Sequence, residues 1–98
     1  DVEYQTKPTE ATKTLARQFV NAGADLIIGS HPHVAQITET YNNRKIYYSL
    51  GNFVFDQYFD EDVRKGLGVI LKINPKDKSI RFEEVNFYLD SGGQTIVL

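Results

Sequence analysis

Several residue types and patterns are missing from this 98-residue sequence. It contains no cysteine, which excludes disulfides and thiolate metal ligands. No hydrophobic run approaches the ~18 residues that a membrane-spanning helix needs. The lysines and arginines are scattered and the net charge is −2, so the sequence lacks the basic surface of a nucleic-acid-binding protein. We therefore expect no nucleic-acid partner.

Methionine and tryptophan are also absent, and only two histidines are present. Because the chain begins at Asp1 and has no methionine, we expect it to be a processed or excised piece of a longer protein. The residues that are present suffice for a core, since 41% are hydrophobic and 12% are aromatic. We predict a single partial domain over residues 1–98.

The opening third predicts a helix followed by a buried strand. Residues 6–10 have the capping pattern of a helix start, with hydroxyl side chains beside a proline and an acid in the first turn. Gly23 is well placed as the helix stop. The apolar run over residues 24–28 is typical of a strand buried on both faces, as in a parallel sheet. The apolar side chains at helical spacing are Ala11, Leu15, Ala16, Phe19 and Val20.

The next part of the chain favours a β-hairpin. Polar and apolar residues alternate over residues 34–41, and an apolar run returns over residues 46–50. Asn42 and Asn43 between them suit a tight turn that needs positive φ. Residues 54–65 are acidic and aromatic without a clear period, and we expect a loop there.

A second hairpin is predicted near the carboxyl end. Its strands cover residues 68–73 and 79–89, and a short apolar end follows over residues 95–98. The sequence therefore predicts an α/β fold of the α+β kind, with one helix followed mostly by β-hairpins.

Both histidines lie in the segment Gly29-Ser30-His31-Pro32-His33, directly after the predicted buried strand. In open α/β sheets that edge is where ligands bind. In an extended segment residues i and i+2 point the same way, and Pro32 biases His31 towards extended backbone. Two convergent imidazoles would make half of a metal site. The alternative is a surface turn whose histidines bond only to their neighbours.

The predicted metal site is incomplete on residue counts. A catalytic zinc ion needs at least three protein ligands, and a two-metal site needs more. Since the sequence has no third histidine, the remaining ligands must be carboxylates or amides. A solvated acidic loop is the alternative interpretation of most of the carboxylates. The carboxylates in question are Asp25, Asp56, Asp60, Glu61 and Asp62.

Two polar residues are candidates for a place near a substrate. Ser30 lies beside His31 but lacks the Gly-x-Ser-x-Gly elbow of a nucleophile, so it is expected to shape the turn or bind an anion. Asn52 is polar among apolar neighbours, and a buried amide must find partners. Gly51 interrupts a strand pattern, which predicts the close approach of a backbone or a ligand. The alternative is a β-bulge in which the Asn52 amide satisfies backbone groups.

Two stretches carry a family resemblance: residues 22–34, AGADLIIGSHPHV, and residues 47–56, YYSLGNFVFD. Together they resemble the CapA/PgsA family of bacterial poly-γ-glutamate capsule-synthesis proteins, which have a calcineurin-like metallophosphoesterase fold. Residues 2–4 are similar to the segment that follows a His-Trp-Gly motif in that family. The resemblance covers about the first 56 residues. It implies the carboxyl half of a two-layer α/β sandwich with a metal centre at the sheet edge.

The resemblance also implies roles for individual residues. In the wider superfamily a Gly-His-x-His motif supplies two metal ligands, and His31 and His33 occupy the matching positions, with Ser30 inserted after Gly29. The two histidines would be the catalytic and metal-binding residues here, at a site for one or two manganese, zinc or iron ions. The earlier Asp-x-His, Gly-Asp and Asn-His motifs have no counterpart, so we expect this chain alone to be inactive.

The function that the resemblance implies is a metal-dependent hydrolase in bacterial capsule or poly-γ-glutamate biosynthesis. The alternative is a non-catalytic accessory protein or polymer-binding scaffold of capsule synthesis or export. The implied partners are the missing amino-terminal half of the domain, the capsule polymer and a membrane synthesis complex, at an extracytoplasmic, membrane-associated location. Because a half-domain exposes a sheet edge and apolar surface, we also expect the chain to dimerise.

Overall fold

A computed structural model of the chain describes residues 4–53 and 61–98. It has one helix and two small three-stranded sheets, which confirms the predicted mixed α/β fold class. The elements in chain order are α1 (Glu10–Asn21), β1 (Leu26–Ile28), β2 (Thr38–Tyr41), β3 (Arg44–Tyr47), the 3-10 helix η1 (Asp62–Arg64), β4 (Lys65–Ile73), β5 (Ile80–Leu89) and β6 (Thr95–Val97).

Helix α1 begins and ends as its sequence predicts. The Thr9 hydroxyl caps the amino end by accepting a hydrogen bond from the Thr12 amide at 3.2 Å. Gly23, with φ of 115°, follows the carboxyl end in a conformation that favours glycine. Ala16 and Val20 are buried against the first sheet. Among the described residues, no helix has the length and hydrophobicity of a membrane span.

The first sheet has the strand order β1-β3-β2, and β3 is its central strand. Strand β1 runs parallel to β3, whereas β2 is antiparallel to it. The turn between β2 and β3 has Asn42 at φ 49° and Asn43 at φ 62°, the positive values that a tight two-residue hairpin turn needs. The parallel strand and the Asn-Asn turn are both confirmed.

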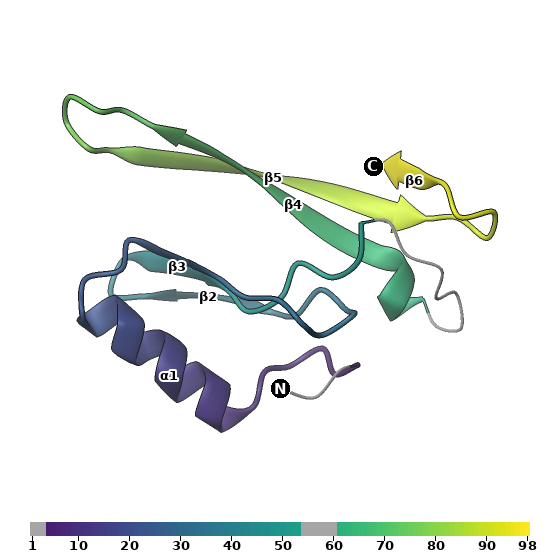
Figure 1. Cartoon of the computed structure of the whole chain (residues 1–98), viewed down its shortest axis with the longest axis horizontal. Coiled ribbons are helices and arrows are strands. Elements are labelled where there is room, and N and C mark those ends of the chain that lie inside the picture. Colours follow the sequence, from purple (N-terminus) through teal and green to yellow (C-terminus); the bar gives the residue numbers. More distant parts are fainter. Residues whose placement is uncertain (1–3, 54–60) are drawn as a thin grey trace.

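The molecule has three layers, with α1 on one side of the first sheet and the β4–β5 hairpin on the other (Figure 1). Successive residues of β3 point to opposite faces, so Ile46 packs on α1 and Tyr47 faces the hairpin. The rings of Tyr47 and Phe82 meet edge to face with their centroids 6.1 Å apart. The Tyr47 hydroxyl donates a 2.6 Å hydrogen bond to the Glu84 carboxylate. Burial raises the pKa of Tyr47, so the hydroxyl stays protonated and keeps donating.

The second sheet has the order β4-β5-β6 and confirms the predicted second hairpin. The segment from Ser49 to Asn52 joins it to the first sheet. Leu50 forms a bridge with Ala35 on one side, and its carbonyl accepts a 2.7 Å hydrogen bond from the Leu67 amide on the other. This connecting segment holds the Asn52 candidate between the two sheets.

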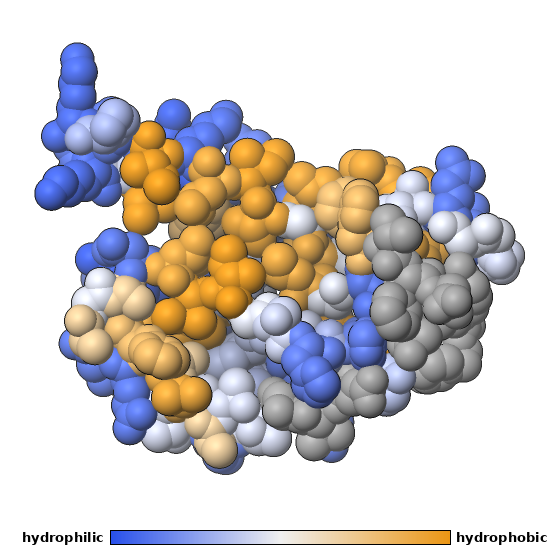
Figure 2. All heavy atoms as spheres, in the orientation of Figure 1, coloured by the Kyte–Doolittle hydropathy of each residue, from blue (hydrophilic) through white to orange (hydrophobic). Residues whose placement is uncertain are grey.

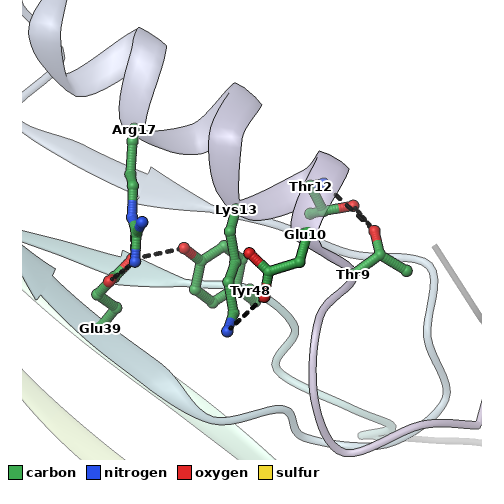
Figure 3. A network of polar contacts seen from close by, with 7 residues as sticks. All are labelled: Thr9, Glu10, Thr12, Lys13, Arg17, Glu39 and Tyr48. Carbon is green, nitrogen blue, oxygen red and sulfur yellow. Dashed lines mark hydrogen bonds and ion pairs between the residues drawn. The ribbon is translucent and has the colours of Figure 1, made fainter.

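A polar network ties α1 to the first sheet (Figure 3). The Arg17 guanidinium forms an ion pair with Glu39 on β2, and the Tyr48 hydroxyl donates to the same carboxylate at 2.6 Å. The hydrogen bond from Arg17, followed by the one from Tyr48, lowers the pKa of Glu39. Burial, followed by the bond to Glu39, raises the pKa of Tyr48, which keeps its proton available for that bond.

Several predictions about the elements in the first half of the chain need correction, among them the strand over residues 46–50, which is β3 at Arg44–Tyr47. The strand predicted over residues 24–28 begins at Leu26, and it is not buried on both faces, since Leu26 and Ile27 are half-buried and Ile28 is 51% exposed. Strand β2 is shorter than the predicted 34–41, since only an isolated bridge at Ala35 precedes it. In the helix, Leu15 and Phe19 are exposed, so the buried stripe is narrower than predicted.

The exposed apolar side chains of α1 and β1 lie on one open face. Leu15, Phe19 and Ile28 line a shallow apolar depression there. Figure 2 shows hydrophobic side chains gathered over the region between the helix and the hairpin.

The loop predicted over residues 54–65 is described only in its last part. Residues 54–60 lie outside the described residues, whereas residues 62–64 form η1 and Lys65 begins β4.

Candidate functional site

The loop that carries the two histidines starts where β1 ends beside β3. The Gly29 amide donates to the Tyr47 carbonyl at 2.6 Å. A Cβ atom at Gly29 would lie 2.4 Å from the Tyr48 carbonyl oxygen, so only glycine fits this close approach. The sequence thus places the loop at the carboxyl end of a parallel strand, as predicted.

The two histidines have different surroundings. His31 has φ of 99°, which contradicts the predicted extended backbone and removes the argument that residues 31 and 33 point the same way. Its side chain is exposed, whereas that of His33 is half-buried. The prediction failed because Pro32 only biases the preceding residue, and the contacts of the loop decide its backbone.

Buried Ser49 holds the loop in place. Its hydroxyl donates to the Pro32 carbonyl at 3.0 Å and accepts from the Gly51 amide at 3.2 Å. Since the side chain has no exposed surface, both bonds lie in a region where unpaired polar groups are costly. Ser49 was not singled out as a functional residue from the sequence. A hydroxyl side chain inside the apolar run 46–50 could have indicated a buried hydrogen bond.

Asn52 contacts the half-buried histidine directly. Its amide nitrogen Nδ2 donates to the Val63 carbonyl at 2.9 Å, and its Oδ1 lies 3.0 Å from His33 Nδ1. Because Oδ1 can only accept, this contact is a hydrogen bond when His33 carries a proton on Nδ1. The lone pair of the neutral ring is then on Nε2, as in histidines that bind metals or accept protons.

Glycines at the joint between the sheets bring Asn52 close to β4. Gly51 has φ of 74°, and a Cβ atom there would lie 2.7 Å from the Lys65 carbonyl oxygen. A Cβ atom on Gly66 would lie 2.1 Å from the Asn52 carbonyl oxygen. The predicted close approach at Gly51 is confirmed, and the approaching group is backbone.

The remaining candidates lie elsewhere or outside the described residues. Asp25 is exposed and pairs with Arg44 at 3.2 Å. Ser30 is exposed in the histidine loop. Within residues 4–53 and 61–98, no group of three or more histidine, aspartate or glutamate side chains could hold a metal ion. The Glu61 carboxylate accepts a hydrogen bond from the Tyr88 hydroxyl and forms an ion pair with Arg64. Asp62 is exposed. Asp56 and Asp60 lie outside the described residues.

Comparison with curated proteins finds relatives that match a segment of about half of the chain. The segment is 54% identical over 55 residues to PGA biosynthesis protein CapA of Bacillus subtilis (strain 168), and 54% identical to capsule biosynthesis protein CapA of Bacillus anthracis. An uncharacterized protein of Sinorhizobium fredii is 42% identical over 53 residues. The match covers 56% of this chain but only 14% of the first relative and 13% of the second.

A family model matches the first part of the chain. It describes the bacterial capsule synthesis protein PGA_cap, and it matches residues 1–57, which include both histidines, Ser49 and Asn52. The matched region is more than half of the 98 residues. The chain therefore belongs to the bacterial capsule synthesis protein (PGA_cap) family.

Proposed function

We propose that the segment from His31 to Asn52 contributes to a metal-dependent hydrolase site of the metallophosphoesterase kind, in a protein of capsule or poly-γ-glutamate biosynthesis. The names of the relatives support the biosynthetic context, since one is named for PGA biosynthesis and another for capsule biosynthesis. The observation that carries the site is the hydrogen bond between His33 and Asn52, because it directs the lone pair of the neutral ring to Nε2.

The residues fit part of the ligand set for a divalent manganese, zinc or iron ion. His33 would supply Nε2, and the exposed His31 would supply a second ring nitrogen. The described residues hold no group of three such side chains, so the remaining ligands would come from outside them, either from Asp56 and Asp60 of this chain or from a longer protein. One or two ions bound there would supply Lewis-acid polarisation of the scissile bond and activation of water.

The contribution of this chain is to orient its histidines before any ligand binds. The buried Ser49 hydroxyl fixes the Pro32 carbonyl, and Asn52 fixes the plane and proton of the His33 ring. The Tyr4 ring lies 5.7 Å from that of His33, tilted by 30°, and covers part of it. Such support lowers the cost of ordering the site when a ligand arrives.

We also propose that the longer protein containing this segment is extracytoplasmic and membrane-associated, as a role in capsule synthesis requires. Its proposed partners are the capsule polymer, a membrane synthesis complex and the amino-terminal half of the same domain. These partners are consistent with curated relatives that are several times longer than the matched segment.

The test is elemental analysis of metal in a longer protein that contains this segment, compared with its His31→Ala/His33→Ala variant. We expect bound manganese, zinc or iron in the parent and a loss of at least tenfold in the variant. Asp25→Ala is the matched control, because it removes a candidate ligand that is paired with Arg44 at the surface. Its metal content should equal that of the parent.

Hydrolysis of phosphoester and amide substrates is then measured on the same three proteins. Turnover that requires metal and both histidines supports the hydrolase. Equal metal content in the parent and the double variant would contradict the proposed site. Metal binding without turnover would favour the alternative of a non-catalytic scaffold in capsule synthesis.

A further inference from the structure

We infer that Asn52 is a positioning residue whose side-chain amide sets the tautomer of His33. In this arrangement the proton stays on Nδ1 and the lone pair of the neutral ring stays on Nε2. The inference rests on the proposed function for its purpose, since a fixed lone pair matters only if Nε2 has a metal or a proton to bind. The tautomer itself is a property of this chain alone.

The assignment follows from the chemistry of the groups on either side of Asn52. A backbone carbonyl can only accept hydrogen bonds, so the atom 2.9 Å from the Val63 oxygen must be the NH₂ group of Asn52. The other end of the amide is then the oxygen, which lies 3.0 Å from His33 Nδ1. An oxygen facing a ring nitrogen at that distance requires a proton on the nitrogen.

The arrangement is held rigidly. Asn52 is 8% exposed, and Val63, whose carbonyl anchors the amide, is 1% exposed. The backbone on both sides of Asn52 is fixed by the close approach of Gly51 to Lys65 and by that of Gly66 to Asn52 itself. Rotating the amide by half a turn would place its oxygen against the Val63 carbonyl, which leaves two buried acceptors facing each other.

An amide is the side chain that this position requires. One partner is an acceptor and the other is a donor, and asparagine offers one group of each kind at the same reach. An aspartate could still accept from His33 but could not donate to Val63. A leucine of similar size could do neither. This asymmetry supplies the variants for a test.

The test is a long-range ¹H–¹⁵N correlation NMR spectrum of the imidazole nitrogens of the ¹⁵N-labelled chain. It is recorded about two pH units above the ordinary imidazole pKa of ~6.5, where the ring pattern distinguishes the two tautomers. Because the chain has only two histidines, a His31→Gln variant assigns the signals of His33. The variants compared are Asn52→Asp, Asn52→Leu and, as an exposed control on β5, Asn86→Leu.

We expect a proton on Nδ1 of His33 in the wild-type chain, in Asn52→Asp and in Asn86→Leu. In Asn52→Leu the share of the ring protonated on Nδ1 should fall, because the acceptor facing that nitrogen is lost. A wild-type ring protonated on Nε2 alone would overturn the inference, and so would an unchanged pattern in Asn52→Leu. If Asn52→Leu does not fold, the wild-type and Asn52→Asp spectra decide, because both must show the Nδ1 proton.

A zinc titration of the longer protein separates this inference from the proposed function. We expect Asn52→Leu to bind zinc about 10–100-fold more weakly, as for other residues that orient a metal ligand. A shifted tautomer in a protein that binds no metal would support the positioning role and contradict the metal site. Tight zinc binding with an unshifted tautomer would leave the metal site supported and contradict the role of Asn52.

Discussion

Residues 4–53 and residues 61–98 use similar strands but bury their apolar side chains to very different extents. In the first region a helix covers one face of a sheet, and Ile46 and Tyr47 at its centre have no exposed surface. The second region is a long hairpin that extends past the first sheet (Figure 1). Toward the tip of the hairpin its apolar side chains are exposed, as with Ile73 at 61% and Ile70 at 46%, whereas Val63 and Leu89 near the other end are buried.

The difference follows from what lies against each sheet. The centre of the first sheet has a layer on both sides, and Phe82 and Glu84 of the hairpin contact its β3 strand, whereas Ile73 at the tip of the hairpin is exposed. The family match coincides with the covered region, since it ends at residue 57. The part of the chain that carries the family likeness therefore also contains most of the buried hydrophobic side chains and the histidine loop.

The largest expected effect is on the free energy of unfolding. The same isoleucine-to-alanine change is made once in each region, so that the two losses can be compared. Ile46→Ala removes a fully buried side chain from the α1–β3 core and should lower the unfolding free energy by about 2–5 kcal/mol. Ile73→Ala on the exposed hairpin should change it by no more than ~0.5 kcal/mol. Urea unfolding followed by circular dichroism measures both.

A milder substitution keeps this test informative if Ile46→Ala does not fold. Ile46→Val should cost about 0.5–1.5 kcal/mol, still more than Ile73→Ala. Similar losses at both positions would show that the hairpin is buried in solution and would remove the contrast between the regions.

The next effect is on self-association through the open apolar face of α1 and β1. Because β1 is the edge strand of its sheet within the part of the chain that the structure describes, and Phe19 beside it is 53% exposed, we expect two copies to meet there. Phe19→Glu should weaken dimerisation at least about tenfold, which corresponds to ~1.4 kcal/mol. Sedimentation velocity over a range of concentrations measures the dimer.

Val97→Glu is the matched control, because it places the same charge at a 64% exposed apolar position on β6, in the other sheet. It should leave dimerisation unchanged. A wild-type chain that stays monomeric at the highest concentration, or a dimer lost equally in both variants, would contradict this use of the face.

The smallest effect is a pH dependence of stability that comes from Glu39. Since Arg17 and Tyr48 lower its pKa below the ordinary 4.5, this carboxylate stabilises the fold fully above its unfolded pKa. That contribution is lost as the pH falls through the lower, folded pKa. Thermal melts of wild type and Glu39→Gln should therefore differ near neutral pH and converge in acid.

Glu83→Gln is the comparison for this effect, because its carboxylate pairs with Lys72 on the exposed hairpin. An exposed ion pair contributes little, so this variant should lower the melting temperature less than Glu39→Gln. A larger loss at Glu83 would show that the polar network of α1 does not stabilise the first region.

Local patterns predicted much of the fold. The capping residues and Gly23 bounded the helix, the Asn42-Asn43 pair predicted the hairpin turn, and the apolar run after the helix predicted a parallel strand. Each of these depends on neighbours in the chain, so the sequence is enough. The exposure of Leu15 and Phe19 was not predictable in this way, because it depends on which neighbours cover the helix.

The candidate site could likewise be predicted from the sequence only in part. From residue order alone it follows that two histidines come after a strand of the sheet and that the Asn52 amide needs partners. The positive φ of His31 and the contacts of Asn52 with His33 and Val63 depend on how distant segments pack together. These bonds connect residues 11 and 19 positions apart, and such contacts form only when the two sheets come together around the segment from Ser49 to Asn52.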